Sequence, residues 1–175
     1  MNVQTKTKAK RYLIYALIIF ASHIFQNTLC IFPELFSVRP ILLISTTVCI
    51  AMFEGEIVGA GAGLFAGLLW DTVTVTADGY NALYLTVACA VCGVLLRILM
   101  RNNIVTFTMM NSAITVIYVL TYILFFISVR GIGGEGYLFL RYYLPMIIYT
   151  LILTPFWYIL IRTVYRKYSF DYTEY

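Results

Sequence analysis

Charged residues are scarce in this 175-residue chain, and the scarcity decides its class. Only 11% of the residues are Asp, Glu, Lys or Arg, whereas 62% are hydrophobic. A water-soluble core of this size does not need so many long uncharged stretches, so the composition predicts a protein that crosses a membrane several times. The stretches also lack strict alternation, and lipid offers peptide groups no hydrogen-bond partner. These two points exclude a barrel of strands and predict an all-α bundle.

Residues that carry chemistry are equally sparse. Histidine occurs once, as His23, and the four cysteines lie in or beside apolar stretches. Cys89 and Cys92 form a C-x-x-C pair, but without a second pair or a nearby histidine this is weak evidence for a metal or redox site. We find no nucleophile with a paired base, no phosphate-binding loop and no ligand set. The sequence therefore predicts a non-enzymatic protein without metal or cofactor.

Long polar connections are also missing, which predicts a single membrane domain over residues 12–163. A basic segment, 1–11, precedes it and a tyrosine-rich tail, 164–175, follows. The six predicted membrane segments are Tyr12–Phe32, Ile41–Phe53, Ile57–Trp70, Ala82–Leu96, Ile104–Val129 and Leu138–Ile161. The second and third are short, because 13 residues of helix rise only about 20 Å against a hydrocarbon core of about 30 Å. They can each cross a locally thin region or re-enter together as a hairpin. In both cases the chain leaves the pair on the side of the membrane from which it entered.

Positive charge is unevenly distributed between the two sides of this arrangement. Nine of the 12 Lys and Arg residues fall on one side, namely Lys6, Lys8, Lys10, Arg11, Arg97, Arg101, Arg162, Arg166 and Lys167. Only Arg39, Arg130 and Arg141 fall on the other. The positive-inside rule then predicts that both termini are cytoplasmic. The net charge of +4 is explained by these segment ends, which argues against a nucleic-acid partner.

Glycine recurs every fourth residue in GEIVGAGAGLFAGLLWD, at Gly55, Gly59, Gly63 and Gly67. Residues four apart on a helix differ by about 40° in azimuth, so the four glycines are predicted to form a slowly winding groove. A bare groove lets a second backbone approach closely, which holds helices together in lipid. The other sides of this helix also carry small residues, namely Ala60, Gly61, Ala62 and Ala66. This favours a central helix that is contacted on all sides. Packing within the chain is the simpler interpretation, and a surface for another protein stays open.

Asp71 continues the glycine spacing to the end of the same segment. An ionised carboxylate there needs water or a donor, so a solvated interfacial residue and a tertiary hydrogen bond or partner contact both stay open. In the following ADGYN, Gly79 is predicted to adopt a positive φ and Asn81 to cap the next helix.

Polar side chains follow one face in two of the predicted segments. His23, Gln26 and Asn27 lie at i, i+3 and i+4, which favours hydrogen bonds to other helices over a ligand pocket. The fifth segment carries a similar stripe of Thr108, Asn111, Ser112 and Thr115. We expect the two stripes to meet.

Pro155 interrupts the last segment. It leaves the carbonyl of Leu151 without its helical donor, which predicts a kink. Hydroxyl groups of Thr150 or Thr154 are candidates to satisfy that carbonyl.

The order of several motifs resembles the rod shape-determining protein MreD family. These motifs are FQNTL, an Arg-Pro pair before an apolar run, GEIVGAGAGLFAGLLWD, DGYNALYL and YTLILTPFWYILIR. The matching positions are Gln26, Arg39, Pro40, Gly59, Gly63, Gly67, Leu68, Asp71, Gly79, Asn81, Ala82, Leu83 and Pro155, within a resemblance that spans Phe25 to Arg162. One departure is Ile41, where family members usually carry an acidic or amide residue, so a polar contact assigned there is in doubt.

The resemblance implies a scaffold of the bacterial cell-elongation complex in the cytoplasmic membrane. Such a protein binds MreC and is linked, directly or indirectly, to MreB filaments and to the glycan polymerase RodA with its transpeptidase. Homo-oligomers stay open. MreD-like proteins are also similar in fold to substrate-binding subunits of vitamin transporters, which are six-helix bundles with an outward pocket. That similarity supplies a second hypothesis, a small-molecule carrier subunit.

Overall fold

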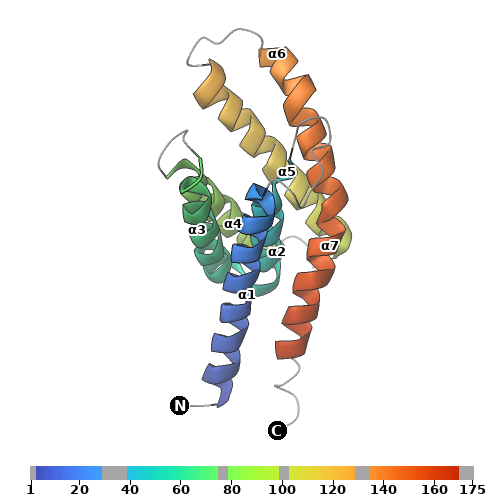
Figure 1. Ribbon diagram of the computed structural model, residues 1–175. Helices are drawn as coiled ribbons and strands as arrows, with labels where there is room; N and C mark the ends of the chain where they lie inside the picture. Colours follow the sequence, from blue (N-terminus) through green and yellow to red (C-terminus); the bar gives the residue numbers. More distant parts are fainter. Residues whose placement is uncertain (1–2, 29–38, 75–78, 99–102, 129–134, 170–175) are drawn as a thin grey trace.

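Helices form every regular element in the part of the chain that the computed structural model describes, residues 3–28, 39–74, 79–98, 103–128 and 135–169. Figure 1 shows their arrangement. The elements are α1 (Val3–Asn27), α2 (Leu42–Glu54), α3 (Glu56–Asp71), α4 (Tyr80–Ile98), α5 (Ile104–Tyr122), the π-helical turn η1 (Ile123–Ser128), α6 (Glu135–Leu138), η2 (Phe139–Tyr143) and α7 (Leu144–Ser169).

Among the described residues, three helical stretches are long and apolar enough to cross a membrane, namely Tyr80–Ile98, Ile104–Phe126 and Phe139–Tyr168. The helix Leu42–Glu54 is apolar but shorter. These lengths agree with the predicted all-α membrane bundle. The first helix differs from its predicted bounds because it begins at Val3, inside the basic segment, and its last residue is Asn27. The predicted end at Phe32 and the tail residues 170–175 lie outside the described residues.

The centre of the bundle is α2, which packs against α1, α3, α4, α5 and α7. Each residue from Leu42 to Met52 is buried. The hydroxyl groups of Thr46 and Thr47 donate back to the carbonyls of Leu42 and Leu43, both at 2.8 Å, so they do not require water. A helix that is apolar on all sides is buried on all sides. The prediction that the glycine helix would be the central one is therefore wrong.

One face of α3 is in close contact with other helices and the opposite face is open. Gly59, Gly63 and Gly67 are buried, whereas Ile57 is 83% exposed. A Cβ atom built on Gly63 would lie 2.8 Å from the carbonyl carbon of Leu85 on α4, closer than real contacts allow. At Gly61, on the open face, a Cβ would have no neighbour within 4 Å.

Gly55 does not belong to the glycine groove, contrary to the prediction. It is the single residue between α2 and α3, and its φ of 87° lies in the region that favours glycine. A Cβ at Gly55 would meet nothing within 4 Å. Instead, Gly93 of α4 approaches this junction, where its added Cβ would lie 2.8 Å from the carbonyl carbon of Gly55. Gly55 therefore makes the turn, and Gly93 makes the close contact.

The start of α1 and the end of α7 lie at one end of the bundle, which we call the proximal end; the opposite end is the distal end (Figure 1). At the proximal end Arg11 of α1 forms an ion pair of 2.9 Å with Glu54 of α2, with 9% and 5% of the two side chains exposed. The Tyr15 hydroxyl donates to the same carboxylate at 2.9 Å. Arg97 pairs with Glu56 at 2.8 Å nearer the surface. The two glutamates that flank Gly55 are therefore each held by an arginine.

Candidate functional site at the distal end of the bundle

The helix α2 begins at the distal end with its first amide groups inside the bundle. The first amides of a helix have no partner within it and need one wherever water is absent. The Ile41 N–H donates to the Thr150 hydroxyl oxygen at 3.0 Å, and the Leu43 N–H donates to the side-chain oxygen of Gln26 at 3.1 Å. Gln26 is thus an interhelical hydrogen-bond acceptor, as its position on α1 suggested.

The polar stripe of α1 consists of His23, Gln26 and Asn27, and its other two members behave differently from Gln26. The Asn27 side chain donates to the carbonyl of His23 at 2.9 Å, one turn back on the same helix. Ser22 also connects α1 to α2, because its hydroxyl lies 3.0 Å from the hydroxyl of Thr46. The i, i+3, i+4 pattern therefore identified the correct face for one of its three residues.

Asp71 caps the start of α4. Its two carboxylate oxygens accept the N–H groups of Asn81 at 3.2 Å and Ala82 at 3.0 Å. A carboxylate at a helix N-terminus satisfies unpaired amides and is favoured by the helix dipole. This geometry decides between the two interpretations of Asp71 in favour of a tertiary hydrogen bond. Gly79, with a φ of 88°, gives the backbone the turn that precedes the helix, as predicted.

Asn81 does not cap α4, contrary to the prediction, because it lies inside the helix and Asp71 already occupies the amides. Its buried side chain instead joins three segments. The amide nitrogen donates to the Thr74 hydroxyl at 3.1 Å, and the amide oxygen accepts the Tyr118 hydroxyl of α5 at 2.8 Å. Asn81 therefore links the segment after α3 to α4 and α5.

The polar stripe of α5 faces α2 and α7 rather than the α1 stripe. The buried Asn111 side chain donates to the hydroxyl oxygens of Ser45 at 3.0 Å and Thr154 at 2.9 Å. The prediction that the two stripes meet is wrong, because α2 lies between them.

Pro155 lies inside α7, which is helical on both sides of it. The hydroxyls of Thr150 and Thr154 donate to the carbonyls of Met146 at 2.8 Å and Thr150 at 3.0 Å. Each hydroxyl has a single proton. Neither threonine therefore satisfies the carbonyl of Leu151, contrary to the expectation.

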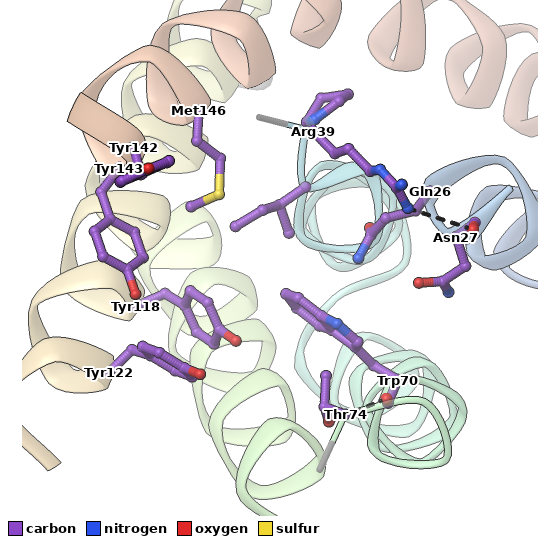
Figure 2. A pocket seen from close by; sticks show the side chains of 12 residues that line it. Gln26, Asn27, Arg39, Trp70, Thr74, Tyr118, Tyr122, Tyr142, Tyr143 and Met146 are labelled. Atoms are coloured by element: carbon purple, nitrogen blue, oxygen red, sulfur yellow. Dashed lines mark hydrogen bonds between the residues drawn. The ribbon is translucent and has the colours of Figure 1, made fainter. Parts of the chain in front are cut away.

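A cavity of about 390 Å³ lies among these capped helix ends (Figure 2). Its lining comes from α1, the start of α2, the end of α3, α5, η2 and α7. One wall carries Gln26, Asn27, Arg39 and Pro40, and the Arg39 guanidinium donates to the Asn27 carbonyl at 3.5 Å. The volume lies within the range of small-molecule sites. We call this space the distal cavity.

No family model, curated protein or solved structure matches the chain. The resemblance to the MreD family therefore rests on the sequence motifs alone. Within the described residues, no three His, Cys, Asp or Glu side chains gather in a way that could hold a metal ion.

The aromatic side of the distal cavity could not be identified from any motif. Trp70 stacks on Tyr118 with ring centroids 5.2 Å apart, and Tyr118 contacts Tyr122, which in turn contacts Tyr143. These four rings form a continuous wall opposite Gln26 and Arg39 (Figure 2). The residues come from three parts of the chain, so their only sequence signal is the general abundance of tyrosine.

Proposed function

We propose that this chain is an integral membrane scaffold of the bacterial cell-elongation complex, similar to MreD, that binds an MreC-like membrane protein. The observation that carries the proposal is an open apolar groove between α1 and α3, next to the close backbone contact of α3 with α4. In this reading the rigid core holds the groove in shape, and the groove receives a transmembrane helix of the partner.

The groove has a volume of about 390 Å³ and an apolar lining. Tyr12 and Ala16 of α1 form one side, Gly61 and Phe65 of α3 form the other, and Ile50 of α2 lies in the lining between them. Helices associate in lipid where small residues let backbones approach. Gly61 offers such a position, since a Cβ there would meet no atom within 4 Å.

The charges of the proximal end support a cytoplasmic location for both termini. The acidic turn around Gly55 opposes the positive-inside rule only weakly, and Glu54 and Glu56 are each paired with an arginine. Successive long helices also run in opposite directions between the proximal and distal ends (Figure 1). This alternation supports a multi-pass protein with six membrane segments.

Filling the groove tests the scaffold function. Gly61→Leu adds bulk where the chain has space and gains helix propensity, so we expect a melting temperature that is not lowered. Co-purification of the MreC-like partner from native membranes should be reduced. Gly136→Leu is the matched control, because Gly136 in α6 also has no neighbour within 4 Å of an added Cβ. Full recovery of the partner with Gly61→Leu would show that the partner binds outside the groove. If no elongation protein co-purifies with the unsubstituted chain, the scaffold function itself is contradicted.

The distal cavity favours a second candidate, the substrate-binding subunit of a small-molecule transporter. A carrier of this kind needs a pocket open toward the outer face, and in the proposed orientation the distal cavity is on that side. The two functions differ in their companions. Purification of the tagged chain from its native cell would recover elongation proteins for a scaffold and an energy-coupling transporter subunit for a carrier.

A further inference from the structure

We propose that the distal cavity binds a small uncharged compound with a planar ring, whose ring nitrogens or carbonyl oxygens accept hydrogen bonds from the lining. The ring would pack against Trp70, Tyr118, Tyr122 and Tyr143, which we call the aromatic wall. The cavity shares no lining residue with the groove between α1 and α3, so this site goes beyond the scaffold function. For a carrier subunit, the same compound would be the class of substrate.

Gln26 presents unused hydrogen-bond donors to the cavity. Only its side-chain oxygen can accept the Leu43 N–H, at 3.1 Å, and this contact fixes which end of the amide is the nitrogen. Gln26 is 8% exposed, and its nitrogen has no hydrogen-bond partner among the described residues. In Figure 2 the amide end of Gln26 points into the cavity on the side of Trp70. A buried donor without a partner is costly, which favours an acceptor at this place.

Further unused donors surround the same space. The indole N–H of Trp70, a residue that is 7% exposed, has no partner in the part of the chain that the structure describes. The same is true of the hydroxyls of the half-buried Tyr122 and Tyr143. The Tyr118 hydroxyl, in contrast, already donates to Asn81 at 2.8 Å. The lining therefore has more donors to offer than acceptors to fill, which selects a ligand rich in acceptors.

The aromatic wall selects the shape of the ligand. Trp70 and Tyr118 are nearly parallel, with an angle of 27° between their rings and 5.2 Å between the centroids. Flat rings pack well on such a surface, by stacking or by edge-to-face contact. Met146 lines the same cavity, and its flexible thioether can adjust to the outline of a ring.

The four donor groups are all neutral, which favours a neutral ligand. A charged group would lose its hydration in a largely apolar cavity, and this costs more than burying a ring nitrogen or a carbonyl. The described lining residues include no Asp or Glu that could pair with a cation. Arg39 donates to the Asn27 carbonyl at 3.5 Å, and its charge is not needed to hold a neutral acceptor.

Trp70 provides a built-in reporter, because the chain has two tryptophans and the other is Trp157 on α7. The indole N–H of Trp157 is buried and has no hydrogen-bond partner, so Trp157→Phe removes no hydrogen bond. The full chain with this change, in nanodiscs of dioleoyl phosphatidylcholine, would be titrated with caffeine and with pyrazine. Both probes are flat and uncharged and have acceptors but no donor. Benzene, which has the shape of pyrazine without its nitrogens, is the control.

We expect a saturable change in Trp70 fluorescence with at least one of the two probes and none with benzene. Gln26→Glu keeps an oxygen for the Leu43 N–H but removes both N–H donors, so it should weaken binding about 3- to 10-fold. Asn27→Asp is the matched control. It adds the same charge to the lining, but the nitrogen it removes already donates to the His23 carbonyl, so it should weaken binding less.

Tyr122→Phe is a second test that does not depend on Gln26→Glu being folded. It breaks no hydrogen bond in the described part of the chain, and it should weaken binding about 3-fold through loss of one donor. If Gln26→Glu does not fold, unchanged affinity in Tyr122→Phe overturns the proposal.

Three other results would also overturn the proposal. The first is that neither probe gives a saturable change with protein shown to be folded by circular dichroism. The second is that benzene binds as tightly as the better probe, and the third is that Gln26→Glu and Asn27→Asp have equal effects. All these measurements use the purified chain without a partner, so failure here leaves the scaffold function standing.

Discussion

Alanine substitutions at Gly63 and Gly61 should have different effects on stability, although the two residues lie on the same helix. Both changes gain the same intrinsic helix propensity, about 1 kcal/mol. At Gly61 the new methyl group has no neighbour within 4 Å. At Gly63 it would lie 2.8 Å from the carbonyl carbon of Leu85 and 3.1 Å from the amide nitrogen of Thr86. These are backbone atoms, so α3 and α4 must move apart.

The propensity gain cancels when the two variants are compared, which isolates the cost of overpacking. That cost is about 1–3 kcal/mol. For a protein of this length each kcal/mol shifts the melting temperature by about 2–4 °C. Thermal unfolding of the purified variants in one detergent, followed by circular dichroism, should place Gly63→Ala several degrees below Gly61→Ala. Equal melting temperatures would refute the close contact between α3 and α4, and with it the rigid core of the proposed scaffold.

Four further outcomes are expected. Asp71→Ala should lower the free energy of unfolding by about 1–2 kcal/mol through loss of the α4 cap, and an unchanged melting temperature would contradict that role. Glu54→Gln should lower the free energy of unfolding by about 2–3 kcal/mol, since the buried Arg11 loses its charged partner but can still reach the headgroup region. Arg97→Gln, which breaks the exposed pair, should change stability little. Equal effects of the two changes would argue against the buried pair. Asn111→Leu should cost less than about 1 kcal/mol in the same melts, because hydrogen bonds between membrane helices average about 0.6 kcal/mol; a larger loss would show that this residue organises the bundle. Glu56→Cys should react with a membrane-impermeant maleimide from the side of the termini only.

Local features of the fold were predictable from the sequence because they depend on neighbouring residues. The two short helices, 42–54 and 56–71, were recognisable from apolar runs on either side of a charged turn. Gly79 was predictable because a glycine after an aspartate marks a turn with positive φ. Gly63 and Gly67 were recognisable because a spacing of four places residues near one face of a helix.

Features that depend on which helices meet could not be predicted. Arg11 and Glu54 are 43 positions apart, and nothing in the local pattern connects them. Asp71 and Asn81 are close in sequence, but their roles depend on how the end of α3 meets the start of α4. The central position of α2 does have a signal in the sequence. Its apolar residues have no preferred side, which is typical of a helix with neighbours all round.

The caps at the distal end explain how a helix as short as α2 can occupy the centre of a membrane protein. A helix of 13 residues spans only about 20 Å, so it cannot bring both ends to water across a core of about 30 Å. Gln26 and Thr150 accept the amides at its start, which removes the need for water there. At its other end Gly55 turns the chain into α3 beside Arg97, whose side chain is 75% exposed. The junction thus reaches the proximal surface, while the start stays buried and has its hydrogen bonds supplied by surrounding protein. The missing helix length lies at the distal end, and the distal cavity is found at the same place.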